Sequence, residues 1–247
     1  MIFNLKITRP NEPFPDKIKY QLKDIIAFLS IPLMFINGYV LLTYFDLPKE
    51  TVAVTDALLR GFLFFILIYL YKDVLQTHWK YFNQSKRNSW LLVILGGILL
   101  QIIISITKKF LPEVDAVASQ GTPLFQNQNG LPEISFSLFL ITLGPIFTSL
   151  IEDITFRYLL LHKLFLDNKI WRVVLVIFNA VIFGLIHYNN FGGHIISTVS
   201  FMTAGLFLNL LYLYTRNIWH VFLIHCLNNF ILSVLGLFIV WEMQLLQ

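Results

Sequence analysis

Long apolar stretches alternate with short charged clusters along the whole chain. A stretch of about 18 or more apolar residues is long enough for an α-helix to cross roughly 30 Å of hydrocarbon, because each residue adds about 1.5 Å. The stretches are continuous and do not alternate as membrane β-strands do, which excludes a transmembrane barrel. The pattern therefore predicts an all-α, polytopic transmembrane helical bundle of about seven spans, at residues 23–45, 57–78, 90–108, 135–162, 171–190, 195–214 and 217–240.

The composition agrees with this pattern. The chain is 57% hydrophobic and 13% charged, whereas an ordinary soluble domain is roughly a quarter charged. The net charge is +4, but the basic residues lie between the predicted spans rather than in one stripe, so we expect no nucleic-acid partner. The single cysteine, Cys226, permits no internal disulfide. We expect an integral membrane protein in contact with lipid.

The positions of the basic residues predict the orientation in the membrane. The N-terminal segment and the linkers near 79–89 and 163–172 are rich in Lys and Arg, whereas the alternate linkers are poor in them. Basic loops stay on the cytoplasmic side, so the N-terminus is expected inside and the C-terminus outside. We expect residues 1–22 to form a cytoplasmic segment and residues 23–247 to form a single membrane domain.

Two further segments bear on topology and source. The linker at 110–134 is rich in proline and glycine, which predicts an irregular external loop. The N-terminal 20 or so residues are too polar and too long for a cleaved signal peptide, so the first apolar run is expected to stay as an anchor. The small size and compact loops favour a protein of the bacterial plasma membrane.

Ionisable groups within the predicted spans are concentrated in the second half of the chain. In the first half, Arg60 and Lys72 are predicted near helix ends, where long side chains reach the interface. A charged side chain in hydrocarbon costs at least about 2.5 kcal/mol. Several such side chains in one half of the chain therefore indicate ion pairs or a functional site. These polar residues of the second half are Glu152, Asp153, Arg157, His187, His225, Asn228 and Asn229.

Their spacing indicates which groups can cooperate. Asp153 and Arg157 are four residues apart on one helical face, which predicts an ion pair. Glu152 points about 100° away and is left free to bind water or metal. His225 and Asn229 are also four apart and could jointly donate to a developing oxyanion. If the fourth, fifth and seventh spans pack together, Glu152 and His187 could hold a water molecule, and the set would suit hydrolysis of an amide bond.

Three motifs carry a family resemblance. Glu152-Asp153-Ile154-Thr155-Phe156-Arg157, Phe183-Gly184-Leu185-Ile186-His187 and His225-Cys226-Leu227-Asn228-Asn229 resemble, in order, the EExxxR, FxxxH and HxxxN motifs of the CAAX-processing and bacteriocin-processing intramembrane peptidases. Asn217-Ile218-Trp219 resembles the family's usual lead-in to the third motif. Any one motif is weak, but three in order on separate spans are specific. The resemblance covers about residues 135–235, and we expect a peptidase core at about 135–240 within the four C-terminal helices.

The resemblance implies a role for each matching residue. Glu152 would be the water-activating base, assisted by His187, while His225 and Asn229 would stabilise the oxyanion. Asp153 with Arg157 would brace the site, and Phe183 would pack beside it. Asp153 stands where the family usually has Glu, but its shorter side chain can still pair with Arg157. Two His and one Glu would also suit a catalytic zinc held by Glu152, His187 and His225, and a metal-independent glutamate mechanism is the alternative.

The resemblance also implies the reaction class and its rivals. The family cleaves membrane-associated peptides or proteins: in eukaryotes it removes the tripeptide after a prenylated cysteine, and in bacteria it is linked to pheromone or bacteriocin maturation and self-immunity. The chief rival is an inactive scaffold or bacteriocin self-immunity protein of the same fold, and a transporter with a proton relay ranks below it.

The depth of His187 in the membrane conflicts with a set of simple straight spans, because His187 is about 15 residues, roughly 22 Å, along its predicted span. The fifth helix must begin outside the membrane, tilt, or have other bounds.

Overall fold

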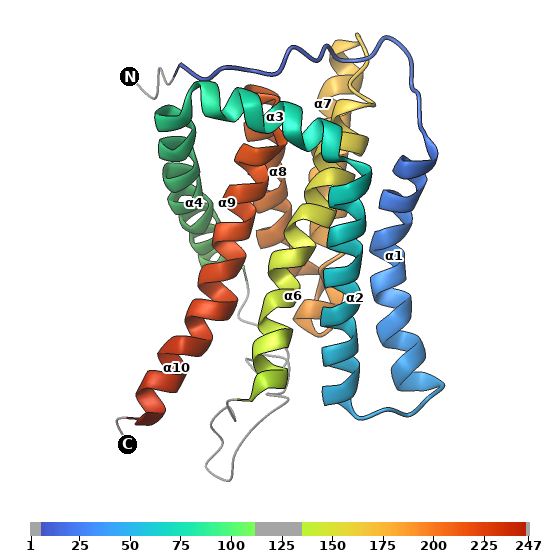
Figure 1. The fold of residues 1–247 in the computed structure, drawn as a ribbon, viewed down its shortest axis with the longest axis vertical. Helices are drawn as coiled ribbons and strands as arrows, with labels where there is room; N and C mark the ends of the chain where they lie inside the picture. Colours follow the sequence, from blue (N-terminus) through green and yellow to red (C-terminus); the bar gives the residue numbers. More distant parts are fainter. Residues whose placement is uncertain (1–5, 112–134, 246–247) are drawn as a thin grey trace.

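The structure, a computed structural model, describes residues 6–111 and 135–245, and the regular elements in these ranges are all helical. Figure 1 shows one bundle with the N-terminal segment running across one end. The π-helical segments η1 and η4 continue α6 and α9, and η2 and η3 are short 3-10 turns. The elements are α1 (Leu22–Thr43), α2 (Lys49–Leu70), α3 (Lys72–Gln84), α4 (Lys86–Lys109), α6 (Phe136–Glu152), η1 (Asp153–His162), α7 (Lys169–Leu185), η2 (Tyr188–Phe191), η3 (Ile195–Thr198), α8 (Val199–Thr215), α9 (Ile218–Phe230), η4 (Ile231–Leu235) and α10 (Gly236–Leu245).

Six helical segments among the described residues are long and apolar enough to cross a membrane. They are Leu22–Thr43, Lys49–Leu70, Lys86–Lys109, Phe136–His162, Ile195–Thr215 and Ile218–Ile239. The predicted polytopic helical bundle is therefore confirmed. The remaining predicted span, 171–190, corresponds to α7, whose 17 residues fall short of the about 20 that a full crossing needs.

The bounds of the second predicted span were wrong. The span predicted at 57–78 is α2, which begins directly after Pro48 and ends before Tyr71. The chain then turns into α3, a separate helix that lies across the ends of its neighbours (Figure 1). Its buried residues Leu75, His78 and Phe82 recur at helical spacing, so one face packs on the bundle while the other stays polar. The predicted linker at 79–89 is therefore mostly helical.

The position of α7 resolves the question of depth. Figure 1 shows α7 beginning beyond α3, at the level of the N-terminal segment, and descending only part of the way along the bundle. The helix ends at Leu185, and His187 lies in the turn that leads into η2. The bounds of the fifth helix therefore differ from the prediction at both ends, since α7 begins at Lys169 instead of 171 and ends at Leu185 instead of 190.

A close approach of α7 to α8 fixes this region. A Cβ added to Gly184 would lie 2.2 Å from the Met202 Cγ, 2.8 Å from the Met202 backbone nitrogen and 2.9 Å from the Thr198 oxygen. Gly205 faces the ring of Phe183 in the same way, with a Cδ1 distance of 2.8 Å. Small residues at such crossings let two helix backbones approach closely. Gly184 and Gly205 therefore allow the close packing of α7 on α8.

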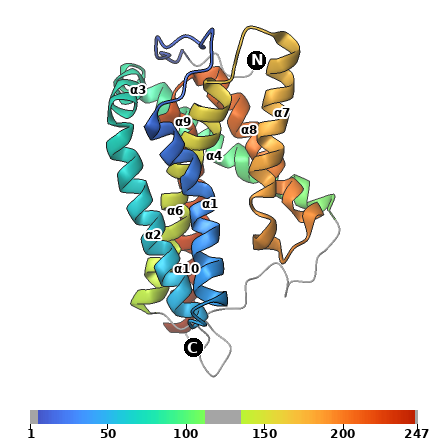
Figure 2. The same ribbon diagram turned by 90° about the vertical axis from the view of Figure 1, so that its right-hand side faces the viewer.

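The N-terminal strap, defined here as residues 6–21, ties several helices together at the α3 end of the bundle. Glu12 accepts hydrogen bonds from the Tyr158 hydroxyl at 2.8 Å and from His78 Nε2 at 3.1 Å. The guanidinium of Arg216 lies 4.2 Å from the centre of the Phe14 ring. The two termini lie at opposite ends of the bundle (Figures 1 and 2). The predicted loop at 110–134 falls almost wholly outside the described residues.

Candidate active site

The site forms where α6, the α7–η2 turn and α9 meet. Glu152 is the last residue of α6 before the backbone widens into the π-helical η1, and π segments within helices are frequent at functional sites. His187 follows the end of α7, and His225 lies within α9. All three residues are buried. The structure thus brings together three of the predicted catalytic residues from three separate parts of the chain.

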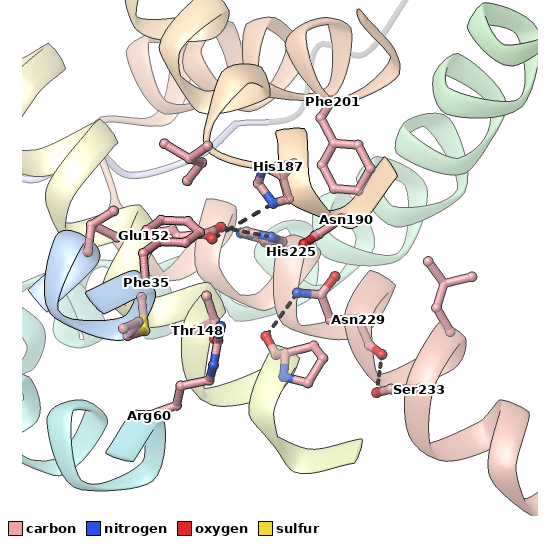
Figure 3. Close-up of a pocket in the computed structure, with 15 residues that line it drawn as sticks. Phe35, Arg60, Thr148, Glu152, His187, Asn190, Phe201, His225, Asn229 and Ser233 are labelled. Carbon is pink, nitrogen blue, oxygen red and sulfur yellow. Dashed lines mark hydrogen bonds and ion pairs between the residues drawn. The ribbon is translucent and has the colours of Figure 1, made fainter. Parts of the chain in front are cut away.

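The Glu152 carboxylate lies between the two imidazoles. Its Oε1 is 3.8 Å from His187 Nε2, and its Oε2 is 3.7 Å from His225 Nε2 (Figure 3). Both separations are longer than a direct hydrogen bond, and polar groups at such distances are commonly bridged by water. The Nε2 atoms and the carboxylate converge on one side of the site. This geometry suits the holding and polarising of a small polar molecule.

The far nitrogen of each imidazole is oriented by an acceptor. His187 Nδ1 lies 2.8 Å from the Phe183 carbonyl oxygen, which can only accept, so Nδ1 carries the proton and Nε2 presents a lone pair in the neutral ring. His225 Nδ1 faces the Asp153 Oδ2 at 3.4 Å. His187 Nδ1 thus contacts a backbone carbonyl, whereas His225 Nδ1 lies beside a buried carboxylate. The two histidines are therefore held for different roles.

Asp153 has two partners where the sequence indicated one. The structure contains the predicted ion pair, with 3.0 Å between Arg157 Nη1 and Asp153 Oδ1, although the N–H groups are not aligned as a hydrogen bond. The second partner is His225, which the sequence analysis did not connect to Asp153. The imidazole of His225 thus lies between the carboxylates of Glu152 and Asp153. The sequence analysis did not predict this, because neighbouring side chains on a helix point about 100° apart. The widened backbone of η1 begins at this point.

Phe183 packs against the charged groups rather than facing the cavity. Its ring lies 4.2 Å from the Arg157 guanidinium, 5.2 Å from the ring of His187 and 5.9 Å from that of His225. Arg157 is fully buried, and an aromatic face offsets part of the cost of burying a guanidinium. The position of Phe183 agrees with the packing role expected for it.

Asn229 lies in the same cavity, but its amide donors are engaged elsewhere. Its Nδ2 donates to the Pro145 carbonyl at 2.9 Å and to the Ser149 hydroxyl at 3.0 Å. Its Oδ1 accepts from the neighbouring Asn228 at 3.0 Å. The predicted shared donation by His225 and Asn229 is therefore not formed in this arrangement. Asn229 must turn away from Ser149 before it can donate to a bound carbonyl.

A cavity of about 300 Å³ opens beside these residues. The sequence analysis missed several of its lining residues, because they carry no motif and are set by packing. Asn190 lies beside His187, and the Phe201 ring stacks on His187 with 4.2 Å between centroids. Figure 3 shows these side chains around Glu152. The lining residues are Ile31, Met34, Phe35, Arg60, Pro145, Thr148, Glu152, Ile186, His187, Asn190, Phe201, His225, Asn229, Leu232 and Ser233.

The predicted position of Arg60 was wrong. It lies in the middle of α2 rather than near an end, and its side chain points into the cavity (Figure 3). Arg60 Nε donates to Asp56 at 2.6 Å, and Nη1 donates to the Thr148 hydroxyl at 2.7 Å. Thr148 is one helical turn before Glu152, so this guanidinium tethers α2 to the catalytic helix. The sequence analysis placed Arg60 near a helix end because it predicted the second span at 57–78, whereas α2 begins at Lys49.

The donor set suits zinc chemically, but its geometry is too open. Zinc holds His nitrogen and carboxylate oxygen at about 2.0–2.2 Å, which brings neighbouring ligand atoms closer than the 3.7 Å and 3.8 Å separations around Glu152. No group of three or more His, Cys, Asp or Glu within residues 6–111 and 135–245 is arranged to hold a metal ion. The residues do not fit a metal as they stand, and we derive no chemical step through one.

The comparison with known families agrees with this geometry. Residues 134–231 match the family described as Type II CAAX prenyl endopeptidase Rce1-like. This segment of the chain is similar to that family. It is less than half of the 247-residue chain, but it contains all three motifs and the residues around Glu152. The family resemblance drawn from those motifs is confirmed over this segment.

The match supports a CAAX-type intramembrane endopeptidase fold for residues 134–231. Together with six apolar helices of spanning length, it indicates an integral membrane protein of the hydrolase class. No curated protein and no solved structure matches the chain. Two elements outside the match, α1 and α2, complete the cavity through Ile31, Met34, Phe35 and Arg60.

Proposed function

We propose that this protein is an intramembrane endopeptidase that hydrolyses a peptide bond in a membrane-associated protein or peptide by a water molecule activated at Glu152. The observation that carries the proposal is the buried Glu152 carboxylate, which lies 3.8 Å and 3.7 Å from two oriented imidazoles on the wall of a cavity. Substrates of the CAAX type and of the bacteriocin or pheromone type both fit this chemistry.

Water activation falls to Glu152 and His187. A water between them can donate one proton to the carboxylate and the other to the His187 Nε2 lone pair, which leaves an oxygen lone pair for the carbonyl carbon. As the C–O bond forms, Glu152 takes the proton. Glu152 then delivers it to the amide nitrogen as the C–N bond breaks, and the products are a carboxylic acid and an amine. Removal of a general base typically costs about 10²–10⁴ in rate.

Stabilisation of the oxyanion falls to His225, joined by Asn229. The Asp153 carboxylate lies beside His225 Nδ1 and helps to position the ring, and an N–H at His225 Nε2 would donate to the developing negative charge. Asn229 adds a second donor once the substrate draws its amide away from Ser149. Loss of one such donor typically costs about 10²–10³ in kcat. The Asp153–Arg157 pair holds this arrangement in place.

The test uses the full-length protein in detergent with fluorogenic peptides that carry the sequences of membrane-protein C-termini, with and without a prenylated cysteine. Glu152→Gln and His187→Ala should each lose at least about a hundredfold in kcat/KM. His194→Ala is the matched control, because His194 is an exposed histidine on the same connection and outside the cavity, and it should retain activity. The thermal transition of each variant shows that loss of cleavage is not loss of fold.

Two further measurements, cleavage in the presence of a chelator and peptide binding, distinguish the alternative mechanisms and functions. Loss of cleavage with a chelator, restored by added zinc, would assign a metal-dependent mechanism to Glu152, His187 and His225. Persistence of cleavage would assign the metal-independent one. Peptide binding without cleavage by the wild type, unchanged in Glu152→Gln, would favour a scaffold or self-immunity protein and overturn the peptidase proposal.

A further inference from the structure

A second cavity lies on the other side of the catalytic helix. It has a volume of about 350 Å³ and is enclosed by α2, α3, α6 and α9. Leu150 of α6 lines this cavity, whereas Thr148 and Glu152 of the same helix line the first, so α6 separates the two. Figure 1 shows α2 and α9 diverging beneath α3 at this place. The lining residues are Phe64, Ile68, Lys72, Leu75, Gln76, Trp79, Leu150, Trp219 and Phe222.

The walls of this cavity are apolar, and its polar lining groups come from one helix. Seven of the nine lining residues named above are aliphatic or aromatic. The other two, Lys72 and Gln76, are exposed and four residues apart, so they lie on the same face of α3. Hydrocarbon thus fits along the walls, while a charged or hydrogen-bonding group fits at α3.

The location favours a lipid over a soluble molecule. The cavity lies between α2 and α9, two helices that are long and apolar enough to cross a membrane. Trp79 and Trp219 pack edge to face with 4.7 Å between ring centroids, and Trp219 Nε1 donates to the Leu75 carbonyl at 2.8 Å. Tryptophans with one polar contact are typical of the interface between lipid headgroups and acyl chains.

The positive charge of Lys72, on the α3 side of the cavity, favours an anionic headgroup. The Lys72 ammonium lies over the Tyr69 ring, 5.5 Å from its centre, in an exposed position. The adjacent acidic residue, Asp73, lines a different cavity beside Glu12. Basic sites between membrane helices bind anionic lipid headgroups, and each Lys near the surface contributes about 1 kcal/mol.

We infer that this cavity binds one anionic diacyl phospholipid, with its phosphate on Lys72 and Gln76 and an acyl chain against Phe64, Ile68 and Phe222. The bound lipid lies behind the catalytic helix and fills the space between α2 and α9. This site shares no lining residue with the Glu152 cavity. A test of lipid binding is therefore independent of the proposed peptidase activity.

The test is native mass spectrometry of the full-length protein, titrated with phosphatidylglycerol or with phosphatidylcholine of the same acyl chains. The wild type should bind the anionic lipid more tightly, and Lys72→Gln should weaken that binding about fivefold, which corresponds to about 1 kcal/mol. Lys80→Gln is the matched control, because Lys80 is an exposed lysine two turns along the same helix and outside the cavity. It should bind as the wild type does.

A second variant tests the acyl-chain part of the site. Ile68→Phe adds bulk to the wall and should weaken binding of both lipids, while inorganic phosphate at the same concentration should bind neither protein. The inference is overturned if the wild type binds the two lipids equally, or if Lys72→Gln and Lys80→Gln weaken binding to the same extent. The latter result would mean diffuse attraction to the basic end of the bundle. Thermal unfolding of each variant in detergent confirms that it is folded.

Discussion

Among single residues, Asp153 matters because it lies against two buried basic side chains, Arg157 and His225. Its carboxylate pairs with the fully buried Arg157 and faces His225 Nδ1. Removal of one member of a buried ion pair leaves an uncompensated charge, which typically costs about 3–5 kcal/mol. The residue that departs from the usual family motif is therefore a positioning residue here.

We predict that Asp153→Asn lowers the free energy of unfolding by about 3 kcal/mol and also lowers kcat, because His225 and Arg157 lose the carboxylate that positions them. Denaturant titration in detergent measures the first effect, and peptide cleavage by the folded fraction measures the second. Asp153→Glu is the control and should retain most of both. Equal stability of Asp153→Asn and wild type would contradict this account of Arg157.

Arg60 and Asp56 form an ion pair, so a substitution of one residue leaves the charge of the other without its partner. Arg60 neutralises Asp56 within the span of α2 and also holds Thr148. We predict that Arg60→Met alone destabilises the protein by roughly 2–3 kcal/mol, because an unpaired carboxylate remains at membrane depth. The double variant Arg60→Met with Asp56→Leu should recover much of that loss. Thermal unfolding of both variants in one detergent makes the comparison, and strictly additive losses would contradict it.

At the scale of the elements, the packing of α7 on α8 decides where His187 lies. A Cβ added at Gly184 would lie 2.8 Å and 2.9 Å from backbone atoms of Met202 and Thr198, and backbone atoms cannot move aside as a flexible side chain can. The helices must separate to admit a methyl group. His187 follows Gly184 by three residues and moves with it.

We predict that Gly184→Ala destabilises the protein by about 1–3 kcal/mol, as overpacking of a tight contact does, and reduces cleavage. Gly38→Ala is the matched control, since a Cβ at Gly38 meets nothing within 4 Å. It should be neutral or stabilising by up to about 1 kcal/mol through helix propensity. Thermal unfolding and cleavage rates measure both variants, and a Gly184→Ala protein that equals wild type in both would refute the contact.

At the scale of the whole molecule, the N-terminal strap joins α3 to the helix that carries the site. Burial raises the pKa of the Glu12 carboxyl, but the hydrogen bond from His78, the nearby His162 and the hydrogen bond from Tyr158 outweigh it and lower that pKa from 4.5 to about 2. A depressed carboxyl pKa stabilises the folded state above the unfolded pKa, and this stabilisation disappears as pH falls through the folded pKa.

We therefore predict that Glu12→Gln lowers the thermal midpoint at neutral pH, and that the difference from wild type shrinks between pH 4.5 and about 2. Thermal unfolding of both proteins across this range measures the difference. Glu50→Gln is the control, because Glu50 is an exposed acid at the other end of the bundle, and its difference should stay small at every pH. A Glu12→Gln difference that is constant with pH would rule out the ionised strap contact.

The amino-acid sequence alone predicted the membrane class, most of the helices and the residues at the centre of the candidate site. Continuous apolar runs dictate helices, because backbone groups in hydrocarbon must bond within one segment. Four-residue spacing on a helix made the Asp153–Arg157 pair predictable. The order of three polar motifs on separate spans indicated Glu152, His187 and His225 before any contact was known.

Only the tertiary structure decided how those residues meet. The contact between Asp153 and His225 depends on how η1 packs against α9, and the entry of Arg60 into the cavity depends on where α2 begins. The engagement of Asn229 by Pro145 and Ser149 depends on the distance between two helices. Sequence spacing specifies which face of one helix a side chain occupies, but contacts between helices depend on their depth, rotation and separation, and these are set by packing across the whole bundle.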